Sequence, residues 1–393
     1  MFKINYFTNK NNYLNKTIHT IYYLIRLSPA KALLMLGFCF FISINSINAQ
    51  TKKYSNEFLA IGVSARALAM SNSIVAISDD VTSGYWNPAG LALVPSDVQV
   101  SLMHAEYFAG IAKYDYGAFA SKIDKGGAIG FSIIRFAVDN IPDTSELIDA
   151  EGNINWDRIK SFSAADMAFI FSYARKLKIQ GLRVGVNAKI VRRKAGDFAS
   201  SWGFGIDAAA QYDYNNWKFG LMARDITTTF NAWSFNLSDE MKEVFTVTGN
   251  EIPSNSLELT MPKFILGASR KFTFFDKFSV LPVIDADIST DGKRNVLIEG
   301  DPFSIDPHMG LELSYSNIVF LRGGIGNIQK ETDITNKKVT TVQPNLGVGV
   351  NIKDLVYIDY ALTDIGNCSI ALYSNIFSLK VNLNKTKKPR PMK

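Results

Sequence analysis

Apolar and polar residues alternate with a period of two along most of the chain after residue 96. In one stretch, Leu182 to Ile190, the apolar side chains share one face and the polar ones the other. Such alternation is the signature of a β-strand with one apolar face. It predicts about fourteen strands, near residues 97–104, 112–122, 126–138, 164–178, 181–193, 199–214, 216–226, 262–276, 278–290, 304–316, 317–327, 341–353, 354–364 and 370–383.

The lengths of these segments and of their connections favour a membrane protein. Many segments have ten or more residues, which is enough for a tilted strand to cross a bilayer and is long for a soluble sheet. Short polar turns, such as 215–216, alternate with long connections, such as 139–163 and 227–261. Outer-membrane barrels have this asymmetry, with short periplasmic turns and long extracellular loops. We therefore predict an all-β fold in which residues 96–383 form a transmembrane antiparallel β-barrel with both termini in the periplasm.

Residues 50–95 precede the strands and differ from them, with many small side chains between Glu57 and Leu91. We predict that they form an N-terminal plug inside the barrel lumen. Asp79 and Asp80 would cap a short helix beginning at Val81, which Pro88 would end, and Gly90 would permit a tight exit. An ion pair from Arg66 to either aspartate would join the halves of the plug. The predicted plug and gating residues are Arg66, Asp79, Asp80, Trp86, Asn87, Pro88 and Ala89; alternatively, they only fold the plug.

The N-terminus has the pattern of a secretory signal peptide. An apolar run over 32–41 follows a basic region and is followed by Asn48-Ala49-Gln50, so residues 1–49 are the predicted signal, with cleavage after Ala49. A different start or an uncleaved anchor is the alternative. Five of the cations behind the formal net charge of +6 lie in this segment and five more in a basic periplasmic tail, 384–393. The remainder carries about −4, so we expect no nucleic-acid binding.

Few residues suit catalysis or metal binding. After the signal, the chain holds only His104, His308 and one cysteine, Cys368, so no internal disulfide and no standard metal site are expected. No nucleophile and base stand out as a pair. We therefore predict no enzyme and no cofactor.

Two segments resemble a known family. Tyr85-Trp86-Asn87-Pro88-Ala89-Gly90-Leu91 and the stretch from Leu102 to Tyr116 are similar to the PorV/PorQ proteins of type IX secretion, relatives of the FadL outer-membrane channels. The resemblance implies a FadL-like barrel in the outer membrane of a Gram-negative bacterium of the Bacteroidota. It also implies a role in binding and shuttling cargo proteins through their C-terminal sorting domains, with type IX translocon subunits, cargo and outer-membrane lipid as partners.

The long connection over 227–261 is a candidate partner-binding loop because it is rich in aromatic residues, namely Phe230, Trp233, Phe235 and Phe245. These side chains could equally pack the loop over the barrel mouth. The FadL resemblance implies an alternative function, a channel for uptake of hydrophobic small molecules through the plug. A structural barrel without a passage is the third interpretation.

Overall fold

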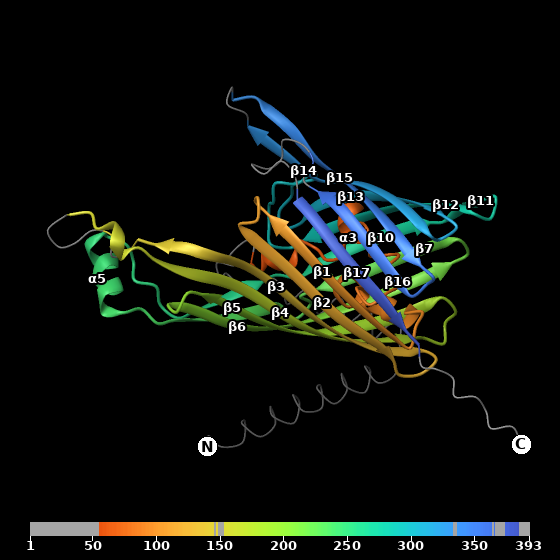
Figure 1. Ribbon diagram of the computed structural model, residues 1–393, viewed down its shortest axis with the longest axis horizontal. Coiled ribbons are helices and arrows are strands. Elements are labelled where there is room, and N and C mark those ends of the chain that lie inside the picture. The colour runs from red at the N-terminus through yellow and green to blue at the C-terminus, as the bar shows by residue number, and fades with distance from the viewer. Residues whose placement is uncertain are drawn as a thin grey trace, which may run out of the picture. The chain divides into compact units, whose positions relative to one another are not determined.

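The computed structural model describes residues 55–144, 147, 153–332, 336–363, 365 and 374–384. The predicted signal peptide, Cys368 and nearly all of the basic tail lie outside these ranges. One antiparallel sheet of seventeen strands dominates the fold (Figure 1). The strands are β1 (Val98–Tyr107), β2 (Ala112–Lys122), β3 (Gly127–Asp143), β4 (Lys160–Lys176), β5 (Leu182–Ala195), β6 (Ala199–Tyr214), β7 (Trp217–Arg224), β8 (Thr229–Phe235), β9 (Ser256–Thr260), β10 (Lys263–Arg270), β11 (Phe272–Phe274), β12 (Phe278–Ser289), β13 (Ser304–Tyr315), β14 (Val319–Thr332), β15 (Lys338–Ile352), β16 (Val356–Thr363) and β17 (Ser374–Leu383).

The sheet closes on itself. Strand β1 pairs with β2 on one side and with β17 on the other, with Val98 opposite Leu383 and Glu106 opposite Asn375. In hydrocarbon an unpaired backbone N–H or C=O costs several kcal/mol, so a membrane-spanning sheet must have no free edge. The predicted transmembrane barrel is therefore confirmed as a closed antiparallel barrel.

Two of the wall strands are interrupted. Strand β6 pairs with β7 through residues 208–214 and with β8 through residues 199–204, so β7 and β8 form one crossing. Strands β9, β10 and β11 likewise form one crossing, which gives fourteen in all. Between β7 and β8, Asp225 and Thr228 have φ of 56° and 61°, and this left-handed backbone breaks the strand.

The connection over 227–261 is not the simple loop predicted from the sequence. It contains β8, the helix α5 (Asp239–Val247) and β9. Strands β8 and β9 pair with each other and carry α5 beyond the barrel wall (Figure 1). The prediction failed because the break at 225–228 hides the continuation of the alternating pattern.

The wall shows the expected inside-outside alternation. On β6, Trp202 and Phe204 are exposed on the outer face, whereas Asp207 and Gln211 on the inner face are buried. An outward apolar band and a polar interior are typical of outer-membrane barrels. Among the described residues, no helix is long and apolar enough to span a membrane.

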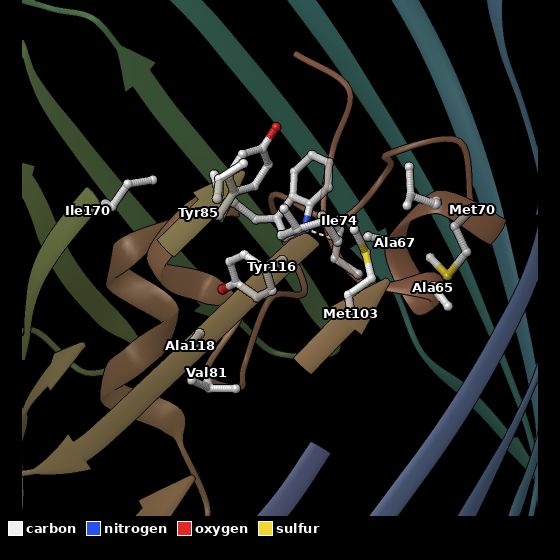
Figure 2. Close-up of a cluster of buried hydrophobic side chains, with 14 of the residues drawn as sticks. Ala65, Ala67, Met70, Ile74, Val81, Tyr85, Met103, Tyr116, Ala118 and Ile170 are labelled. Carbon is white, nitrogen blue, oxygen red and sulfur yellow. Dashed lines mark hydrogen bonds between the residues drawn. The ribbon is translucent and has the colours of Figure 1, made fainter. Parts of the chain in front are cut away.

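The chain before β1 fills the lumen as four short helices, which together with their connecting residues 55–97 we call the plug. They are η2 (Glu57–Leu59), α3 (Ala65–Ala69), α4 (Ser83–Trp86) and η3 (Pro88–Leu93). Figure 2 shows part of the core, in which Tyr85 and Ile74 of the plug belong to the same buried cluster as Met103 of β1 and Tyr116 of β2. These side chains are almost fully buried, so the main hydrophobic core lies between the plug and the inner wall.

Candidate functional site

Arg66 ties the plug to the inner wall. Its guanidinium donates to both carboxylate oxygens of Glu312 on β13, at 2.9 and 3.2 Å, and to Asp79 Oδ1 at 3.2 Å. The predicted ion pair between Arg66 and an aspartate of the plug is therefore present, with Asp79. The bidentate contact to Glu312 was not predicted, and it extends the pair into the wall.

Glu312 continues this contact into a chain of charges along the wall. Arg322 of β14 donates from Nε to Glu312 at 2.7 Å and from Nη1 to Asp359 of β16 at 2.6 Å. All three side chains are buried. Since each carboxylate and guanidinium has a charged partner, the cost of removing them from water is offset. The network lies near the short turns, at residues 316–318 and 353–355.

Asp80 binds a second strand of the wall. Its Oδ2 accepts a hydrogen bond from Lys380 Nζ of β17 at 2.6 Å, and its Oδ1 accepts from the backbone N and the hydroxyl of Thr82 at 2.9 and 2.6 Å. Burial alone would raise the pKa of this carboxyl, but the positive charges of Lys380 and Arg66 hold it well below its usual range. Asp80 is thus a buried anion between plug and barrel.

The predicted helix cap at Asp79 and Asp80 is present only in part, because Asp80 accepts from the backbone N of Thr82, whereas Asp79 binds Arg66. Helix α4 begins at Ser83, its N-cap is Thr82, and no side chain caps it. The carboxylate of Asp80 turns back on Thr82 and toward Lys380. The two oxygens of the carboxylate thus have different partners: Oδ1 accepts the local bonds of Thr82, and Oδ2 accepts from Lys380, the charged partner that a buried carboxylate requires.

Trp86 and Asn87 fix the centre of the plug. Trp86 is 4% exposed and donates from Nε1 to the carbonyl of Val63 at 2.9 Å. Asn87 is fully buried, and its amide donates to the carbonyl of Val75 at 3.0 Å and to that of Ala210 on β6 at 3.1 Å. Asn87 thereby joins two parts of the plug to the wall.

Helix α4 ends at Trp86 with Asn87 as its C-cap, directly before Pro88, as predicted; Pro88 also begins the next helix, which was not predicted. It is the first residue of η3, where Asn87 Oδ1 accepts from the backbone N of Ala89 at 3.1 Å. Proline suits this position because it has no N–H to satisfy. The backbone of Pro88 and Ala89 packs directly on Gly185 of β5, where a Cβ would clash with both residues.

The expected role of Gly90 in the exit to the first strand is also wrong. Gly90 lies inside η3, and a Cβ there would collide with the carbonyl of Ser78. Close packing within the plug, not a turn, requires this glycine.

Two lumen-facing wall residues that the sequence did not single out also hold the plug. Asp285 of β12 accepts from the backbone N of Ile74 and of Val75, at 2.7 and 2.9 Å. Gln211 of β6 donates to the carbonyls of Val75 and Ser78, at 3.1 and 2.9 Å. The sequence does show that both residues are polar positions on predicted strands. It does not show their partners, because these lie in the plug, far away in sequence.

Above the plug, on the side of the long connections, lies a cavity of about 1220 Å³ that we call the vestibule. The plug supplies its floor, including Phe58, Ile61 and Leu68. Tyr107 and Phe136 of the wall continue this apolar side. An apolar surface facing an enclosed space is the usual form of a site for small molecules.

The opposite side of the vestibule is polar but mostly paired. The ion pairs on it are Lys263–Asp287 at 2.6 Å, Arg193–Asp166 at 3.0 Å and Arg294–Glu57 at 3.2 Å. These charges satisfy one another, whereas the Oδ1 atoms of Asn72 and Asp306, also on the lining, have no hydrogen-bond partner among the described residues. Among the described residues, no group of three or more metal-ligating side chains could hold a metal ion.

The four aromatic residues predicted for partner binding do not form one patch. Phe230 lies on the outer face of β8 and is 41% exposed. Trp233, on the inner face, donates to Glu258 at 2.6 Å and stacks with Phe235 at 6.2 Å, while Arg193 lies over its ring. Phe245 lies in α5.

The sequence matches no family model and no curated protein. Solved structures with a similar fold include the toluene transporter TbuX of Ralstonia pickettii, 14% identical, with a TM-score of 0.50, covering 82% of this chain and 99% of TbuX. The monoaromatic hydrocarbon channel CymD is 11% identical, with a TM-score of 0.51 and coverages of 83% and 98%. The toluene transporter TodX of Pseudomonas putida is 12% identical, with a TM-score of 0.50 and coverages of 81% and 96%. This likeness shows the fold, a closed antiparallel β-barrel of the kind found in these transporters and channels.

Proposed function

We propose that this protein is an outer-membrane channel for small hydrophobic molecules, with the plug as its gate. The observation that carries the proposal is the vestibule, which is large enough for a small molecule and has an apolar part of its lining where the plug meets Tyr107 and Phe136. A ligand would enter from the side of the long connections and rest against Phe58, Ile61 and Phe136. The similar structures are named as transporters or channels for toluene and monoaromatic hydrocarbons, which supports this ligand class.

The plug would control passage beyond the vestibule. It is fixed to the wall through Arg66, Asp80 and Asn87, so a ligand could pass only when some of these contacts open. The chemistry needed is binding and release, for which no catalytic group is required. We therefore propose a non-catalytic role in the outer membrane.

A photoreactive alkylbenzene tests the proposal. Ala60 is exposed on the vestibule lining, so Ala60→Trp would place a bulky indole in the cavity without removing a buried contact. Ala232, exposed on β8 next to the outward Trp202 in register, offers Ala232→Trp as the matched control. We expect labelling near Phe58 and Phe136, read by peptide mass spectrometry, to fall at least tenfold in Ala60→Trp alone. Equal labelling in both variants would reject the vestibule as the binding site.

The second candidate is the one that the PorV/PorQ resemblance implies, namely binding of type IX cargo and translocon subunits. The feature favouring it is the extension formed by α5 and its flanking segments, where Val247 is 80% and Ile252 46% exposed. Exposed apolar side chains beyond the membrane suit a protein partner. Replacing residues 237–255 by Asn-Gly, a two-residue hairpin turn, should abolish binding of a purified cargo sorting domain and leave alkylbenzene labelling intact. Unchanged cargo binding would rule out the extension as the cargo site, and no binding of the sorting domain by the unmodified protein would remove this candidate.

A further inference from the structure

The outer wall has an apolar groove of about 560 Å³ that spans β6, β7, β10 and β12. Its small outward residues are Ala210, Ala268 and Ala286, and taller side chains such as Leu221 and Ile284 stand beside them. These residues are outward by the alternation of each strand, so the groove opens toward hydrocarbon. Its lining also includes the intervening positions Gln211, Gly220, Gly267 and Asp285, whose side of the sheet faces the plug.

Arg270 lies on the same face of β10, two residues from Ala268 toward the short turn after β11. Two strand residues span about 7 Å, so the guanidinium stands close to the end of the groove. It lies over the rings of Trp217, at 5.5 Å, and Phe272, at 5.2 Å. Among the described residues it has no hydrogen bond or ion pair, and its Nε is buried without a partner.

The surroundings of Arg270 place it at the edge of the membrane. Trp217 and Phe272 are outward and partly exposed, as are Tyr212 and Tyr214 on neighbouring β6. Such aromatic belts lie at the level of the lipid headgroups. A guanidinium at that level, with no protein anion near it, matches the phosphate of a lipid in charge and in hydrogen-bonding geometry.

We propose that this surface is a binding site for one phospholipid of the leaflet on the short-turn side. The phosphate binds Arg270, and one acyl chain lies in the groove over Ala210, Ala268 and Ala286. The site is separate from the vestibule and does not depend on the function proposed above.

Arg175 shows how this site differs from a basic residue that merely reaches the interface. It also lies near a short turn, at the end of β4, but it pairs with Asp124 at 3.3 Å and with the Tyr173 hydroxyl at 3.2 Å. Arg175 is 52% exposed in its side chain, and it does not line the groove. It therefore offers a matched control, because it is a cation at the interface that lacks both the groove and the unsatisfied guanidinium.

Native mass spectrometry of the delipidated protein, titrated with phosphatidylglycerol, tests the proposal. The variants are Arg270→Gln, which removes the charge, and Ala268→Phe, which keeps the charge and fills the groove; Arg175→Gln is the control. Both test substitutions are on the outer face, and heat-dependent mobility in electrophoresis reports whether each variant is folded. Diacylglycerol, which has acyl chains and no phosphate, is titrated in parallel.

We expect one phosphatidylglycerol to bind the unmodified protein and Arg175→Gln equally, and diacylglycerol to bind more weakly. Arg270→Gln should weaken the association constant roughly fivefold, as expected for one basic residue at an anionic lipid surface, and Ala268→Phe should also weaken it. Equal binding to all four proteins, or equal binding of the two lipids, would overturn the site. Loss in Arg270→Gln with no change in Ala268→Phe would overturn the seating of the acyl chain.

Discussion

Lys380→Met should loosen the plug while leaving the barrel closed. The Lys380–Asp80 pair joins β17 to the plug at 2.6 Å, with side chains 13% and 8% exposed. Removing one partner of a buried ion pair costs about 3–5 kcal/mol, because the other charge stays buried. Asp80 would keep its two hydrogen bonds from Thr82, so we expect about 3 kcal/mol.

Hydrogen exchange of the plug amides measures this loss. A change of about 3 kcal/mol in the opening free energy corresponds to roughly 150-fold faster exchange. The acceleration should centre on residues 81–87, which follow Asp80, and spare the β1–β17 pairing. The double variant Asp80→Asn with Lys380→Met should recover part of the protection, because no buried charge is left unpaired.

Lys113→Met is the matched control. Lys113 pairs with Asp139 at 3.6 Å, with both side chains more than a third exposed, and such pairs contribute about 1 kcal/mol or less. Exchange in the plug should then be unchanged. If Lys380→Met alters exchange at residues 81–87 by less than twofold, the pair does not hold the plug, and the reasoning is refuted.

Three further predictions concern the plug. Asn87→Ala should cost about 1–3 kcal/mol, since it removes the acceptor of the buried Ala89 N–H and a donor to the carbonyls of Val75 and Ala210, and urea titration of tryptophan fluorescence should show an earlier transition. Gly185→Val should prevent seating of Pro88 and expose the plug to protease, whereas Gly117→Val, whose Cβ would approach only Leu102, at 3.6 Å, should leave the digestion pattern unchanged. The pKa of Asp80 is lowered in the folded state, so its carboxylate stabilises the fold at pH values above the ordinary aspartate pKa of 3.8, and this stabilisation should disappear as the pH falls below 3.8. Hydrogen exchange of the plug, corrected for intrinsic rates, that stays constant from pH 5 to 2 would contradict this prediction.

The barrel could be predicted from the sequence because its physical rule is local. Each strand must place apolar side chains outward at every second position, as Trp202 and Phe204 do, and that period is visible in any short window. The exceptions were β8 and its partner β9, because the left-handed residues Asp225 and Thr228 interrupt the strand and hide its continuation.

The contacts of the plug could be predicted only in part, because most of them join distant residues. The Arg66–Asp79 pair spans thirteen residues and was anticipated. The contacts of Arg66 with Glu312 and of Asp80 with Lys380 span 246 and 300 residues. Glu312 and Lys380 lie on the inner faces of β13 and β17, but only the closed barrel places them beside the plug.

Uptake of an apolar fluorescent dye by Gram-negative cells that express the protein tests the central claim most directly. The account predicts faster entry than in cells without the protein, return to the background rate in Ala60→Trp, and no change in Ala232→Trp. Entry at the background rate with the folded, unmodified protein in the outer membrane would contradict a channel for hydrophobic molecules.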